Sequence, residues 1–294
     1  MTVLITRRMA LLGSLVAVPA LPSFQAKGQD ALHGAAKAQL AELERQHGGR
    51  LGVAVIDTGS GKRIEHRAGE RFAMCSTFKF LAAAYILARV DRKEESLDRQ
   101  VVFSKEDIVT WSPVTEKRIG GEGMTMAEIC EAAITQSDNT AGNLQLASFG
   151  GPAGLTAFAR ALGDNQSRLD RWEIELNEAK TGDPRDTTTP AAMLENMHKI
   201  LLGNALSRPS RDQLIAWLVA NKTGGKRFRS VLPEDWRIGD KTGTGANGAT
   251  NDIAIIWPPG RKPILVAGYY TESHASDDQR NGVLAEVGRI AAAI

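Results

Sequence analysis

Cysteine and histidine are scarce in this chain of 294 residues. The two cysteines are Cys75 and Cys130, and the five histidines are scattered without the spacing of metal ligands. Cys130 falls within an apolar helical stretch, EICEAAI, where a thiol packs as a small hydrophobic group. We therefore expect two free thiols, and neither a bound metal nor any other cofactor. A Ser-His-Asp triad is equally unsupported.

An excess of one charge and a long apolar run are missing from the main part of the chain. The 36 Lys+Arg against 34 Asp+Glu leave a net charge of +2, so no global field directs the protein to nucleic acid. After the N-terminus, no apolar run approaches the roughly 18 residues that span a bilayer. We expect a monomer without a membrane anchor that acts on a small molecule.

The N-terminus, residues 1–26, has the layout of a secretory signal peptide. Arg7 and Arg8 precede an apolar stretch over 9–20, which small residues and a polar segment follow. The segment TRRMAL also resembles a twin-arginine export signal, so the general secretory route and the twin-arginine route both stay open. The sequence predicts export to the periplasm by one of them.

Strand patterns occur towards both ends of the chain, with helical patterns between them. LGVAVIDTGSGKRIEHRAGERF alternates like two strands joined by a turn, and WRIGDKTGT, NDIAIIWPPG and PILVAGYYTE resemble three more strands. Helices are predicted over 32–47, over 277–294 and through most of 72–217. We predict an α/β protein of the α+β type, with an antiparallel sheet built from both chain ends, flanking helices and an inserted all-helical lobe. The predicted boundaries are 30–66 plus 220–294 for the α/β lobe and 67–219 for the helical lobe, with a cleft between them.

The stretch MCSTFKF places a serine and a lysine at the start of an apolar helix. Residues three apart share a helix face, so the ammonium of Lys79 can lie one turn beyond the hydroxyl of Ser76. The pair can be a nucleophile and its base, and the helix start can stabilise an oxyanion. The alternative is a helix cap with the lysine in solvent. The pair alone does not decide, because Ser-x-x-Lys occurs by chance roughly once in such a chain.

Three further polar stretches decide between these interpretations. Ser137-Asp138-Asn139 follows a predicted helix, Lys241-Thr242-Gly243-Thr244 closes a predicted strand, and RWEIELNEA with GDPRD lies between helices. Each alone could be a turn, a strand end or a charged surface loop. Ser-x-x-Lys, Ser-Asp-Asn and Lys-Thr-Gly in this order are the motifs of serine β-lactamases and penicillin-binding proteins. With the Ω-loop at about 168–186, the chain closely resembles a class A β-lactamase.

The resemblance implies a role for each catalytic residue. Ser76 would be the nucleophile, Lys79 part of its activation, and Ser137 the proton relay towards the leaving nitrogen. Glu173 and Asn177 would hold the water that releases the acyl group. Whether Lys79 or Glu173 takes the serine proton stays open.

The resemblance also implies which groups hold the substrate. The backbone N–H groups of Ser76 and Thr244 would form the oxyanion hole, and Asn139 would hydrogen-bond the side-chain amide of the substrate. The substrate carboxylate would face the motif Lys241, Thr242, Gly243 and Thr244. Arg171 and Asp186 resemble the pair that clamps the Ω-loop.

Several positions depart from the best-known members of the family. Ile174 follows Glu173 where a proline with a cis peptide is common, which leaves the isomer open. Thr250 replaces a frequent arginine, and Arg227 in GGKRFRS fits the alternative arginine for the carboxylate, or else a solvated basic loop. Gly245 stands where some carbapenem-hydrolysing members have a cysteine bridged to the one before the nucleophile. Trp111 resembles the aromatic residue at the cleft mouth, or else it is a core tryptophan.

The sequence favours hydrolysis of the amide bond of penicillins and cephalosporins through a Ser76 acyl-enzyme. A peptidoglycan D,D-peptidase or transpeptidase would share the first three motifs but would not need the Glu173 water. A penicillin-binding sensor would be acylated and remain so. The RWEIELNEA loop argues against both alternatives.

Overall fold

A five-stranded antiparallel sheet forms the centre of the α/β part of the protein. The computed structural model describes residues 24–294. The strand order is β2-β1-β9-β8-β7, so strands from the two ends of the chain pair in one sheet. Their bounds are β1 Arg50–Asp57, β2 Arg63–His66, β7 Arg237–Thr244, β8 Thr250–Trp257 and β9 Ile264–Thr271. This arrangement confirms the predicted fold class.

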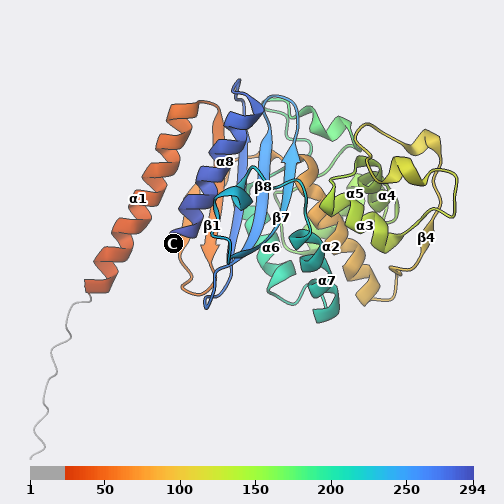
Figure 1. Ribbon diagram of the computed structural model, residues 1–294, viewed down its shortest axis with the longest axis horizontal. Coiled ribbons are helices and arrows are strands. Elements are labelled where there is room, and N and C mark those ends of the chain that lie inside the picture. Colours follow the sequence, from red (N-terminus) through yellow and green to blue (C-terminus); the bar gives the residue numbers. More distant parts are fainter. Residues whose placement is uncertain (1–23) are drawn as a thin grey trace, which may run out of the picture.

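Both faces of the sheet are apolar, because helices cover each of them. Helices α1 (Phe24–His47) and α8 (Asp277–Ala292) lie side by side on one face, and α6 (Pro190–Leu201) packs on the other (Figure 1). Along β9, Leu265 and Ala267 join the cluster on the α6 face, while Ile264 and Val266 join the cluster under α1 and α8. The alternation of side chains in a strand thus produces two hydrophobic cores from one apolar run.

The middle of the chain is built around the buried helix α2 (Phe78–Asp91). It packs against α3 (Met126–Thr135), α4 (Asn139–Ala147), α5 (Gly151–Ala161) and α7 (Arg208–Val219). Two short ladders, β3 Phe72–Ala73 with β6 Thr187–Thr188 and β4 Gln100–Val101 with β5 Met124–Thr125, complete this part. Short 3₁₀ turns occur at Cys75–Thr77, Lys105–Asp107, Thr115–Arg118, Glu175–Glu178 and Phe228–Val231. Since α6 and α7 also pack on the sheet, the exact lobe boundaries remain a prediction.

The ends of the predicted elements agree with the structure within a few residues, except at the N-terminus. Helix α1 begins at Phe24 rather than at 32, and most of the predicted signal segment lies outside the described residues. Among the described helices, none is both long and apolar enough to cross a membrane.

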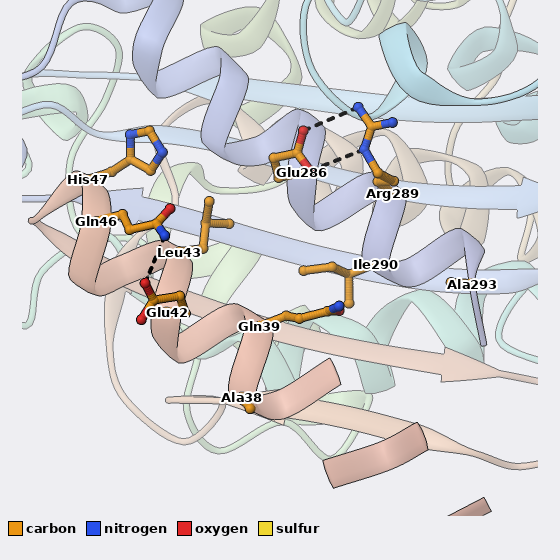
Figure 2. A pocket seen from close by; sticks show the side chains of 10 residues that line it. All are labelled: Ala38, Gln39, Glu42, Leu43, Gln46, His47, Glu286, Arg289, Ile290 and Ala293. Atoms are coloured by element: carbon orange, nitrogen blue, oxygen red, sulfur yellow. Dashed lines mark hydrogen bonds and ion pairs between the residues drawn. The ribbon is translucent and has the colours of Figure 1, made fainter. Parts of the chain in front are cut away.

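A groove separates the outer surfaces of α1 and α8. Leu43 and Ile290 lie along it, and the Glu286–Arg289 ion pair lies at its edge (Figure 2). Strand β7 is at the opposite side of the sheet from β2, against which α1 packs. None of the predicted site residues lines this groove.

Candidate active site

Ser76 lies in a 3₁₀ turn, Cys75–Thr77, that leads directly into α2. Lys79 is in the first turn of α2, and its Nζ lies 3.0 Å from Ser76 Oγ. The lysine side chain is fully buried, with an exposed fraction of 0%. The interpretation with Lys79 in solvent is therefore wrong, and the predicted pair is formed.

Lys79 Nζ has three hydrogen-bond partners and a carboxylate beside it. Its Nζ donates to Ser76 Oγ at 3.0 Å, to the Ser137 carbonyl at 3.0 Å and to Asn139 Oδ1 at 2.7 Å. Glu173 Oε1 lies 2.9 Å from the same Nζ. This contact has the distance of an ion pair, but its geometry is not that of a hydrogen bond, so Glu173 Oε1 has no hydrogen-bond partner in the described part of the chain.

Helix α4 leaves space for the lysine at Gly142. A Cβ atom on this glycine would lie 2.7 Å from Lys79 Cε, closer than two carbon atoms approach without displacement. The absence of a side chain here allows the lysine stem to pass between α2 and α4 towards Ser137. This glycine is thus part of what positions the ammonium.

The Ser137-Asp138-Asn139 loop is held by its central residue. Asp138 caps α4 by accepting from the Ala141 N–H, and it also accepts from the N–H groups of Val114 and Thr115. Ser137 adopts a left-handed backbone conformation, with φ of +56°, and its carbonyl accepts from Lys79. Asp138, for which the sequence suggested no role, therefore fixes the two residues on either side of it.

The Ω-loop is clamped at its base as expected. Arg171 Nε lies 2.6 Å from Asp186 Oδ2, and Asp186 Oδ1 accepts from the N–H groups of Asp170 and Arg171. The Glu173–Ile174 peptide bond is cis, which answers the question that the sequence left open.

The Ω-loop is also attached to α4 at Glu173. Asn143 accepts from the Glu173 N–H at 2.9 Å and donates to the Glu173 carbonyl at 3.0 Å. The sequence analysis does not identify Asn143 as a site residue, although it lies four residues after Asn139 on the same face of α4.

Glu173 and Asn177 meet inside this loop. Asn177 Nδ2 donates to Glu173 Oε2 at 2.5 Å. Within the described part of the chain, Glu173 Oε1 and Asn177 Oδ1 are buried and have no hydrogen-bond partner. Buried acceptors normally have a donor, so these two oxygens can accept hydrogen bonds from a small polar molecule.

Strand β7 closes the site from the sheet side. Lys241 Nζ donates to Ser137 Oγ at 3.0 Å and to the Thr242 carbonyl at 2.7 Å. A Cβ atom at Gly243 would lie 2.9 Å from the Met74 carbonyl oxygen, so glycine is required where the strand crosses the turn of the nucleophile. Burial, together with the positive charge of Lys79, holds the pKa of Lys241 well below the ordinary lysine value.

The N–H group of Thr244 points away from the sheet. Strand β7 is an edge strand, and the Thr242 carbonyl accepts Lys241 on its free side. Backbone groups two residues apart in a strand point in the same direction. The N–H of Thr244 is therefore directed to the same free edge, and the turn that carries Ser76 packs against β7.

Alternate side chains of β7 pair with the segment 221–229 on the face that α8 covers. Asp240 accepts from Asn221 and Arg229, Thr242 contacts Thr223, and Thr244 accepts from Arg227. These three side chains occupy alternate positions of the strand and therefore point to the same face. Each of them contacts a different part of the segment 221–229.

Arg227 is buried, with an exposed fraction of only 8%. Its guanidinium donates to the Gly243 and Asn251 carbonyls at 2.9 and 2.5 Å, to Thr244 Oγ1 at 2.7 Å and to Asn281 Oδ1 at 2.8 Å. The solvated-loop interpretation is therefore wrong.

Arg280 on α8, which the sequence did not indicate, donates to Thr250 Oγ1 at 3.2 Å. Arg280 thus contacts Thr250, the residue at the position where many family members carry an arginine.

Trp111 lies at the surface beside the Ser137 loop. Its side chain is 63% exposed, so the core interpretation is wrong. Its indole N–H donates to the Gln136 carbonyl, and its own carbonyl accepts from the Asn139 N–H. The position is compatible with the predicted place at the mouth of the site.

The two cysteines are buried and unpaired, as predicted. A Cβ atom at Gly245 would lie 2.7 Å from Cys75 Sγ, so this glycine stands directly opposite the thiol. Burial raises the pKa of both thiols to about 12. Among the described residues, no group of three or more His, Cys, Asp or Glu side chains could hold a metal ion.

Comparisons with known proteins show the family of the chain. Residues 35–294 match the "Beta-lactamase enzyme family". Beta-lactamase AST-1 of Nocardia asteroides is 51% identical over 252 residues, which are 86% of this chain and 81% of that protein. The carbapenem-hydrolyzing beta-lactamase KPC of Klebsiella oxytoca is 48% identical, with 85% of this chain and 86% of that protein covered.

Solved structures are similar over most of the chain. An ancestral (GNCA) class A beta-lactamase is 64% identical with a TM-score of 0.86, and the alignment covers 88% of this chain and 99% of that one. The putative class A beta-lactamase PenP of Rhodopseudomonas palustris is 59% identical with the same TM-score and the same coverage.

The fold and the site define a β-lactam hydrolase, and the chain belongs to the β-lactamase enzyme family. Within that family, its similarity to the solved structures makes it a class A β-lactamase.

Proposed function

We propose that this β-lactamase opens the amide bond of penicillins and cephalosporins through an acyl-enzyme on Ser76. The hydroxyl of Ser76 would attack the carbonyl carbon and form an ester, while the carbon–nitrogen bond of the ring breaks. The proton lost by Ser76 would reach the leaving nitrogen through Ser137. Lys79 lies beside Ser76 Oγ and holds the Ser137 backbone, while Lys241 donates to Ser137 Oγ and leaves the Ser137 proton free to move to the leaving nitrogen, which supports this route.

The oxyanion would bind between two backbone N–H groups, those of Ser76 and Thr244. Donors aimed at the position of developing charge lower the barrier of acyl transfer by several kcal/mol, about 2.7–4 for one donor. The free edge of β7 and the turn at the start of α2 would supply these two donors.

The observation that carries hydrolysis, rather than acylation alone, is the pair of buried acceptors in the Ω-loop. Glu173 Oε1 and Asn177 Oδ1 belong to hydrogen-bonded side chains and have no hydrogen-bond partners within residues 24–294. A water molecule can donate one hydrogen to each. Glu173 would then take a proton as the water attacks the ester, which makes it the general base of deacylation.

The remaining predicted residues would hold the substrate. Asn139 Nδ2 donates one hydrogen to the Thr110 carbonyl, which leaves the second for an amide of the substrate. Trp111 would cover the opening, and Lys241 with the threonines of its motif would bind the carboxylate. The buried position of Arg227 behind Thr244 supports an indirect contribution to the same anion.

Two measurements on purified protein test this proposal. A chromogenic cephalosporin should be turned over many times per enzyme, and a slowly hydrolysed β-lactam should add its mass to the peptide that contains Ser76. Ser76→Ala should abolish both. An adduct on another serine would refute the assignment, and a permanent adduct with every penicillin and cephalosporin would favour a sensor or a peptidase.

We also propose that the chain is exported to the periplasm, acts there as a monomer and protects the cell from β-lactams. Secretion of an amino-terminal fusion and growth on ampicillin would test export and protection, and sedimentation would test the oligomeric state. Loss of protection on deleting 1–26, with activity kept in the lysate, is the expected result.

A further inference from the structure

The motif Lys241-Thr242-Gly243-Thr244, which is proposed to bind the substrate carboxylate, contains two threonine hydroxyls in different environments. Thr242 is buried, whereas Thr244, two residues further along β7, is exposed. Thr244 Oγ1 accepts a hydrogen from Arg227 at 2.7 Å, and in the described part of the chain its own proton has no acceptor. That proton is therefore available to an anion outside the strand.

The proton of Thr242 is already used inside the protein. Asn221 Nδ2 donates to Asp240 at 2.5 Å, which fixes Asn221 Oδ1 as an acceptor towards Thr223. The N–H and the hydroxyl of Thr223 both donate to that oxygen, at 3.0 and 2.8 Å. Since the Thr223 proton is spent there, the 2.5 Å contact between the hydroxyls of Thr223 and Thr242 requires Thr242 to be the donor.

The reverse arrangement is unfavourable. If Thr223 donated to Thr242, its oxygen would lie 2.8 Å from Asn221 Oδ1 with no hydrogen between the two atoms. Two acceptor oxygens at that distance repel each other. The chain of hydrogen bonds from Thr242 through Thr223 and Asn221 to Asp240 therefore has one favoured direction.

We propose that Thr223 is a positioning residue that competes with the substrate carboxylate for the proton of Thr242. The substrate would be held first by Lys241 and by the free hydroxyl of Thr244. Thr242 would donate to the carboxylate only after turning away from Thr223, so Thr223 would limit the selectivity of the site for an acidic substrate. This inference rests on the proposed function.

The experiment compares one chromogenic cephalosporin as the free acid and as its neutral methyl ester. The ratio of the two kcat/KM values reports on the carboxylate and cancels general effects on folding or acylation. Thr223→Val keeps the shape and removes the competing acceptor, so the ratio should rise by up to about tenfold, the lower range of a hydrogen bond to a charged group. Thr223→Ala should shift the ratio in the same direction, and Thr223→Ser should restore the parental ratio.

A second measurement uses Thr244→Val in two backgrounds. In the parental protein, it should lower the ratio by about tenfold or more, because the motif 241–244 loses the threonine hydroxyl whose proton is free. In the Thr223→Val background the loss should be smaller, because Thr242 can take over. An unchanged or lower ratio in Thr223→Val, or an equal loss in both backgrounds, would overturn the inference. If the parental enzyme hydrolysed neither compound, the proposed function would fail instead.

Discussion

Replacing Glu173 with glutamine separates the two halves of the proposed reaction. Glutamine keeps the shape of the side chain and can still contact Asn177, but it cannot accept a proton from water. Ser76, Lys79 and Ser137 are unchanged. We therefore expect the acyl-enzyme to form and then to persist.

The loss in deacylation follows from the role of the carboxylate. A positioned general base contributes about 10²–10⁴-fold to a rate, so the release of the acyl group should slow by at least that factor. Acylation should slow less if Lys79 takes the serine proton, because its contact with Ser76 Oγ at 3.0 Å remains. The ratio of the two effects thus also indicates which residue is the base in acylation.

The same substitution should lower the stability of the fold. The side chains of Lys79 and Glu173 are fully buried, with 2.9 Å between Nζ and Oε1. Breaking a buried ion pair by removing one partner costs about 3–5 kcal/mol. The lower end is expected here, because three neutral acceptors still hold the ammonium.

Intact-mass measurement after mixing, together with stopped-flow absorbance, gives both rates, and urea unfolding gives the stability. Glu175→Gln is the matched control, since Glu175 is an exposed carboxylate two residues further along the same loop. It should behave as the parental enzyme. Parental turnover of a good substrate by Glu173→Gln would show that the water is bound and deprotonated elsewhere.

Three further predictions concern groups around the site. Arg227→Ala should lower kcat/KM by about 1.5–3 kcal/mol. It should also destabilise the fold, because two buried carbonyls lose their donor. Unchanged kinetics would show that Arg227 has a structural role only. The pKa of about 12 for Cys75 and Cys130 predicts that neither thiol reacts with a disulfide reagent at pH 8 while the protein is folded. After unfolding, two thiols per chain should be counted. A count of zero thiols would reveal a disulfide. The low pKa of Lys241 predicts that kcat/KM falls with rising pH at a lower pH than an ordinary lysine would give, because Lys241 loses the positive charge that binds the substrate carboxylate. Lys241→Arg should move this decrease in kcat/KM to higher pH. An unchanged pH profile would assign the decrease to another group.

The sheet could be predicted from the sequence because its strands are short and bounded by turns. The turn at 58–61 joins β1 to β2, and the Pro258-Pro259-Gly260 turn joins β8 to β9. The catalytic motifs could be found because each is contiguous in sequence. The position of Ser76 beside Lys79 needed only the period of a helix.

Contacts between distant segments could not be predicted in the same way. The burial of Arg227 depends on how the segment after α7 runs along β7, and no local pattern fixes that register. Trp111 has a left-handed backbone, with φ of +64°, and lies in a loop that Asp138 holds through the Val114 N–H. Its exposure depends on contacts of that loop with a segment distant in sequence. A single sequence gives the type of such residues but not the surface that they meet.

The alternation of strand β7 explains how one short motif serves two functions. Gly243 faces the turn that carries the nucleophile, and Lys241, on the same side of the strand, reaches Ser137. Thr242 and Thr244 face the opposite side, where the segment 221–229 decides which hydroxyl proton is free. A slip of one residue in the pairing with β8 would exchange these two sets of side chains. The register of β7 is therefore a condition for the proposed catalysis and substrate binding at once, and the partners of Asp240, Thr242 and Thr244 in the segment 221–229 hold the strand in that register.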